Sequence, residues 1–60
     1  MHKCYTICVN DVETLCDHRG MIIAVYDYQS RQFTQLLRHL KDYQQQALTE
    51  WKNAKDQLLI

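Results

Sequence analysis

The sequence predicts an α+β fold, in which a small antiparallel β-meander of two or three strands precedes one long C-terminal α-helix. Residues 1–28 are rich in β-branched and aromatic side chains, which favour strands. Residues 29–60 are instead rich in Leu, Gln, Lys, Arg and Ala, which favour a helix. We therefore expect a single domain over residues 1–60, with the sheet in the first range and an amphipathic helix in the second.

The first predicted strand covers residues 4–9, because its side chains alternate between two faces. Its larger apolar residues fall on one face: Tyr5, Ile7 and Val9. Asn10 and Asp11 follow the strand, and both residue types tolerate the positive φ angles of a tight turn. The sequence therefore predicts a two-residue hairpin turn at this point.

The segment after this turn has two interpretations. Either residues 12–17 are the second strand of a three-stranded meander, or residues 10–20 form one loop between two strands. Gly20 marks a turn in both cases, because glycine adopts a positive φ angle at little cost. The unbroken apolar run at residues 21–26 predicts the strand that the rest of the fold covers best.

The helix predicted over residues 29–60 contains no residue that breaks a helix, and its apolar side chains share one side of a helical wheel. Such a helix would be ~45 Å long, whereas a strand of six residues is only ~20 Å long. The sheet would therefore cover the first half of the apolar stripe only. A break near residues 44–46, a second copy of the chain or another protein would have to cover the rest.

The spacing in this stripe favours association. Apolar residues recur alternately four and three residues apart, as in a coiled coil, with Gln44 as a polar residue in the seam. We therefore expect a homodimer through the C-terminal helix, with Trp51 at an interface. Tyrosine and tryptophan are enriched in protein interfaces. The predicted interface residues are Tyr28, Tyr43, Ala47, Leu48, Trp51, Ala54 and Leu58.

Candidate metal ligands and catalytic residues are few. Three cysteines and a histidine supply the ligand types that zinc prefers: Cys4, Cys8, Cys16 and His18. However, Cys4 and Cys8 would lie ~13 Å apart along a strand, too far to bind one zinc ion. Cys16 and His18 could form a catalytic pair, but the sequence near them offers no group that would stabilise an oxyanion. The acidic residues near the first turns lack calcium-loop spacing, so we interpret them as turn and edge residues: Asp11, Glu13 and Asp17. We expect reduced thiols, no metal, no cofactor and no enzymatic activity.

Charge and hydropathy restrict the expected partners and location. Seven basic and seven acidic side chains give no net charge, which argues against nucleic acid and anionic membranes as partners. The longest apolar run is far shorter than the ~20 residues that cross a membrane, and no signal-peptide pattern is present. An odd number of cysteines without such a signal is typical of a cytoplasmic protein.

The predicted function is binding. A small cytosolic chain without a catalytic set is typical of an inhibitor, adaptor or antitoxin-like regulator that occupies a surface of a larger protein. Its helix and aromatic residues are the expected binding surface. The alternative is a dimeric nucleic-acid-binding regulator that uses basic residues of the helix: Arg31, Arg38, Lys41 and Lys52.

Overall fold

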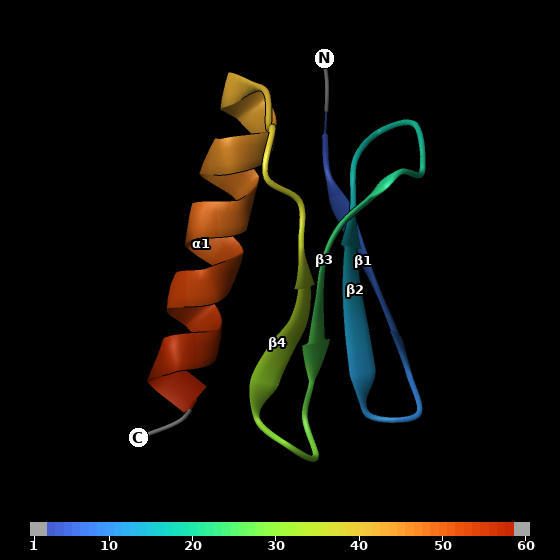
Figure 1. Cartoon of the computed structure of the whole chain (residues 1–60), viewed down its shortest axis with the longest axis vertical. Helices are drawn as coiled ribbons and strands as arrows, with labels where there is room; N and C mark the ends of the chain where they lie inside the picture. The colour runs from blue at the N-terminus through green and yellow to red at the C-terminus, as the bar shows by residue number, and fades with distance from the viewer. Residues whose placement is uncertain (1–2, 59–60) are drawn as a thin grey trace.

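The computed structural model shows four antiparallel strands followed by one helix (Figure 1). It describes residues 3–58, with side-chain surroundings through residue 56. The elements are β1 (Tyr5–Val9), β2 (Val12–Cys16), β3 (Ile22–Asp27), β4 (Gln32–Leu36) and α1 (Asp42–Leu58). Each strand pairs with the next one along the chain, in the order β1-β2-β3-β4. The predicted α+β meander with a C-terminal helix is confirmed, but it has four strands where two or three were expected.

The turns of the first half agree with the sequence. Asn10 and Asp11 have φ angles of 53° and 63°, so a tight turn with two left-handed residues joins β1 to β2. The strand interpretation of the following segment is the right one, since β2 lies within the predicted range. Gly20 has a φ angle of 90° in the turn before β3. Local sequence signals therefore define this part of the fold.

The structure differs from the predicted helix over residues 29–60, because the chain turns back after β3 and forms β4. Arg31 has a φ angle of 58° in this turn, and the ring of Phe33 packs edge-on against Tyr26 at a centroid distance of 4.8 Å. Pairing with β4 completes the hydrogen bonds of β3, which would otherwise be an edge strand. The free energy gained from this strand pairing and from the packing of Phe33 outweighs the helix preferences of these residues, which are only a few tenths of a kcal/mol per residue.

The shorter helix removes the length mismatch that the sequence suggested. Helix α1 has 17 residues and is therefore ~26 Å long. It runs without a break through residues 44–46, and the change of direction occurs earlier, in the segment between β4 and α1. Helix α1 therefore packs against the chain's own sheet, and Figure 1 shows it running alongside β4. Within residues 3–58, no helix is long and apolar enough to cross a membrane.

The core lies between α1 and one face of the sheet. Its buried apolar residues come from β2, β3 and α1: Leu15, Ile23, Ala24, Tyr26 and Trp51. Trp51 is 9% exposed, and its ring lies edge-on to Phe33 at a centroid distance of 5.7 Å. A helix over residues 29–60 predicts that Trp51 lies beyond the reach of the sheet. The structure corrects this position, because a helix that begins at Asp42 carries Trp51 back over β2 and β3.

Candidate functional site

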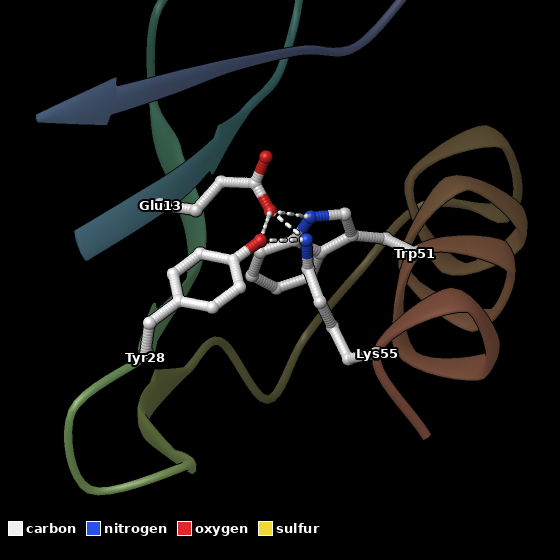
Figure 2. A network of polar contacts seen from close by, with 4 residues as sticks. All are labelled: Glu13, Tyr28, Trp51 and Lys55. Carbon is white, nitrogen blue, oxygen red and sulfur yellow. Dashed lines mark hydrogen bonds and ion pairs between the residues drawn. The ribbon is translucent and has the colours of Figure 1, made fainter. Parts of the chain in front are cut away.

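A carboxylate lies between the sheet and the helix. Glu13 is in β2 opposite Tyr26 of β3, so its side chain is on the sheet face that carries α1. Its Oε1 atom accepts hydrogen bonds from the Tyr28 hydroxyl at 3.0 Å and from the indole Nε1 of Trp51 at 2.9 Å. The same oxygen forms an ion pair with Lys55 (Figure 2). One carboxylate therefore joins β2, the segment after β3 and two turns of α1.

The ammonium group of Lys55 is surrounded by aromatic rings. Its Nζ atom donates a hydrogen bond to the Tyr28 hydroxyl and lies 4.9 Å from the centroid of that ring. It also lies 5.4 Å from the Trp51 ring and 5.9 Å from the Tyr26 ring. Ring faces carry partial negative charge and attract a cation. The side chains of Lys55 and Glu13 are only 7% and 16% exposed, so the ion pair is part of the core.

Both members of this pair remain ionised. Loss of solvent opposes the charge of Glu13, but hydrogen bonds from Lys55, Trp51 and Tyr28 outweigh it and hold the pKa of the carboxyl below its ordinary value. Loss of solvent also opposes the charge of Lys55. Here the hydrogen bonds with Glu13 and Tyr28 outweigh it and raise the pKa of the ammonium.

A second carboxylate holds the other end of the helix. Asp17 follows β2 and is 1% exposed. It accepts hydrogen bonds from the backbone N–H groups of Arg19 and Met21 at 2.9 and 2.8 Å, and from the Gln44 side chain at 3.1 Å. Burial opposes the negative charge of Asp17. The pKa of its carboxyl is nevertheless lowered by the hydrogen bonds from the N–H groups of Met21 and Arg19, by the charge of His18 and by the hydrogen bond from Gln44. Gln44 also accepts a hydrogen bond from the N–H of Lys41, so it joins the first turn of α1 to the sheet.

The cysteine and histidine candidates do not come together in the described part of the chain. Cys4, Cys8 and Cys16 form no disulfide, and Cys16 is buried whereas Cys8 is exposed. His18 instead hydrogen-bonds through Nδ1 to the Tyr43 hydroxyl at 3.0 Å. Burial, followed by the negative charge of Asp17, raises the pKa of the Cys4 thiol. Among residues 3–58, no three histidine, cysteine or acidic side chains lie close enough to hold a metal ion.

The predicted interface residues are mostly turned toward the chain's own sheet. Tyr28 and Trp51 bind Glu13 in the polar network that also contains Lys55. Tyr43 contacts His18. Ala47 and Leu48 are half-buried, Ala54 is exposed, and the side chain of Leu58 lies outside the described ones. The first part of the expected coiled-coil seam lies in β4 and the following segment, outside α1. Pairing through the helix would therefore require residues such as Trp51 to leave the core.

The basic residues of the nucleic-acid alternative do not share a helix face. Arg31, Arg38 and Lys41 precede α1, which begins at Asp42. Arg31 lies before β4 and Arg38 lies after it, so a strand separates them. Lys52 is the one of the four within α1, and its Nζ lies 5.6 Å from the centroid of the Phe33 ring. The expected basic helix face is absent from the described structure, because half of the predicted helix is not helical.

The sheet face opposite α1 is the surface that the sequence analysis missed. Because Glu13 faces the helix, its neighbours Val12 and Thr14 face the other way, together with Val9 and Ile7 that pair with them. Val9 is 58% exposed, Ile7 is 48% exposed and Tyr5, on the same face, is 46% exposed. Alternation of these residues was visible in the sequence. The sequence does not indicate that α1 covers only one face of the sheet and leaves the face with Tyr5, Ile7 and Val9 exposed.

The described part of the chain contains no pocket that would hold a small ligand. Its distinctive features are therefore the polar network under α1 and the exposed apolar face on the other side of the sheet. Comparison with known proteins found no family model, no curated protein and no solved structure that matches this chain.

Proposed function

We propose that this chain is a cytoplasmic regulator that binds a larger protein and blocks or bridges one of its surfaces, as an inhibitor, adaptor or antitoxin-like protein. The observation that carries the proposal is the apolar sheet face opposite α1. Its strand β1 exposes Tyr5, Ile7 and Val9, and β1 carries no charged residue. Contiguous exposed apolar surface on a small domain is typical of a protein-binding site. The partner would present a matching apolar surface, and no catalytic step or cofactor belongs to the proposal.

This face is a better binding surface than the aromatic helix stripe. Trp51 is buried, and both Tyr28 and Trp51 donate hydrogen bonds to Glu13, so a partner that took up these side chains would have to break those bonds. Ile7 and Val9 have no such role and are available without a change in the fold. Proteins in pre-organised complexes generally change little on binding. The proposed interface therefore lies on β1 and β2, away from most of the residues that the helical pattern suggested.

The cytoplasmic location in the proposal rests on the thiols. Three cysteines form no disulfide, although Cys8 is exposed on the surface. Unpaired thiols are typical of reducing compartments.

Paired capture experiments with the intact chain would test the function. The chain is immobilised and incubated with lysate of its native cells in low and high salt. The variant Ile7→Thr/Val9→Thr changes the apolar sheet face opposite α1, which we call the open face and which contains Tyr5, Ile7 and Val9. The variant Leu36→Thr changes a similarly exposed apolar residue on the side that carries α1. We expect one protein that the wild type and Leu36→Thr retain and the double variant loses. Its retention should resist salt, because apolar contacts are not screened.

Two results would contradict the proposal. Equal retention by all three proteins would show that the open face is not the binding surface. Retention of nucleic acid that decreases steeply as salt increases would favour the alternative regulator, because phosphate contacts depend strongly on salt. Circular dichroism of each variant would show that the fold is unchanged.

A further inference from the structure

Strand β1 forms an edge of the sheet, and nothing in the described chain protects this edge. All five of its residues are exposed, and none is charged. Its register with β2 is continuous, without a bulge. Figure 1 shows α1 beside β4, away from β1. Natural edge strands are usually blocked by charged residues, proline, bulges or a covering element. The opposite edge has such protection, because β4 is irregular and mostly polar.

The register identifies the backbone groups that face outward. In a hairpin with a two-residue turn, the pair next to the turn is hydrogen-bonded, and hydrogen-bonded pairs then alternate with non-hydrogen-bonded ones. Val9 pairs with Val12 next to the turn, so Val9, Ile7 and Tyr5 bond to β2. The N–H and C=O groups of Thr6 and Cys8 therefore point away from the sheet. These are the groups that another strand can bind.

We propose that two copies of the chain pair through antiparallel β1 strands centred on Ile7, which joins their sheets into one. This proposal is independent of the proposed function, because it uses backbone groups of the edge and not the side chains of the open face. In this register Thr6 of one copy lies opposite Cys8 of the other, twice by symmetry. Four outward N–H groups, two from each copy, then find C=O partners. Tyr5 lies opposite Val9 of the second copy, so the apolar faces become continuous.

Charge complementarity supports this register. The same pairing brings Lys3, which precedes β1, alongside the turn that contains Asp11 in the second copy. Both residues are exposed. Because the dimer is symmetric, the contact between Lys3 and Asp11 occurs twice. Registers centred on Thr6 or Cys8 pair fewer residues of β1 and separate these two charges. The self-pairing centred on Ile7 therefore pairs all five residues of β1 and also brings opposite charges together.

Crosslinking tests the register. Ile7→Cys is made in a Cys8→Ser background and oxidised mildly. Ile7 would lie opposite its own copy as a non-hydrogen-bonded pair with Cα atoms ~4.5 Å apart, within disulfide reach. Thr6→Cys in the same background is the matched control, since its two copies would be offset along the strands beyond the ~7 Å limit. We expect a covalent dimer from Ile7→Cys only, with the linked residues identified by mass spectrometry.

Sedimentation tests the dimer itself. Thr6→Pro removes one outward N–H from each copy but none that bonds to β2, whereas Thr6→Val keeps it. We expect the dimer dissociation constant to increase by about tenfold or more in Thr6→Pro only, because two hydrogen bonds are lost. A monomeric wild type, or equal crosslinking of both cysteine variants, would overturn the proposal.

Two further measurements keep the outcome clear. A dimer that resists Thr6→Pro but is lost in Ala54→Glu, on the exposed side of α1, would show that the helix mediates association. If Thr6→Pro does not fold, the crosslinking pair still decides the question. Thr6→Pro leaves the side chains of the open face in place, so partner capture can persist when dimerisation is lost. Failure of one proposal is therefore distinguishable from failure of the other.

Discussion

The sheet buries charge on the face that α1 covers and exposes aliphatic side chains on the opposite face. Under the helix, Glu13 and Lys55 form an ion pair among aromatic rings. On the other side, Ile7 and Val9 point into solvent. A monomeric domain usually shows the reverse distribution, with charges outside and aliphatic residues inside. The difference indicates that the covered face determines how the helix docks, whereas the open face is available for a partner.

Hydrogen bonds give the helix a defined position that apolar contacts alone would not. The hydrophobic effect is not directional, so a small core tolerates several helix positions. Glu13 and Asp17 come from β2 and the turn after it, and they bind different turns of α1. Glu13 holds Trp51 and Lys55, and Asp17 holds Gln44. These two attachments determine both the rotation of the helix and its position along its axis.

The largest expected effect is that of Trp51→Ala, which removes a core side chain and a hydrogen bond to Glu13. We expect the free energy of unfolding to decrease by about 3–5 kcal/mol, as for other large core truncations. Ile7→Ala on the open face is the comparison, and its cost should be well below that of the core substitution. Urea unfolding followed by circular dichroism measures both. Equal effects would mean that the two faces do not differ in their contribution to stability.

Glu13→Gln should have the next largest effect, because it leaves Lys55 buried without its counter-charge. We expect a loss of about 2–3 kcal/mol, slightly below the range for a fully buried pair because Glu13 keeps some exposure. The double variant Glu13→Gln/Lys55→Met should recover part of this loss. A double-mutant cycle in urea measures the coupling, and strictly additive effects would contradict a direct interaction.

The smallest and most gradual effect is that of pH. The pKa of Glu13 is below its ordinary value of 4.5 and that of Asp17 is below 3.8. Their stabilising contributions are therefore present above these ordinary values and are lost as pH decreases through the folded-state values. Lys55 has a raised pKa, so its contribution is present below its ordinary value of 10.5 and is lost as pH rises beyond it. Unfolding measured against pH should show a plateau between these limits.

The Glu13→Gln variant is the control for the acid side. It should show a shallower loss of stability on acidification than the wild type, with the remaining slope due mainly to Asp17. An unchanged acid profile would mean that the Glu13 carboxylate does not contribute through its charge.

Those parts of the fold that depend on neighbouring residues could be predicted from the sequence. The turn at Asn10 and Asp11 and the existence of a C-terminal helix both follow from local preferences. Strand β4 could not be predicted, because Phe33 fits an amphipathic helix as well as a strand and only pairing with β3 decides between them. Contacts with residues that are distant in sequence determine whether such a segment forms a strand or a helix.

The polar network depends on contacts that are even more distant. Glu13 in isolation resembles an edge residue, and nothing near it in sequence indicates that Trp51 and Lys55 return to it. The available signal was in the helix, where Trp51 and Lys55 are four residues apart and therefore share a face. An indole N–H that packs into a core usually finds a hydrogen-bond acceptor. A carboxylate on a facing strand, as Glu13 is, supplies such an acceptor.

The sequential strand order also determines how the chain folds. Because every strand pairs with the strand that precedes or follows it, most backbone pairing joins residues that are close in sequence. Chains with such local contacts fold quickly, since little loop-closure entropy is lost before contacts form. The hairpin of β1 and β2 can form first, because its turn residues already favour the required backbone angles. Docking of α1 depends on residues 38 positions apart such as Glu13 and Trp51, so we expect it to follow formation of the hairpin.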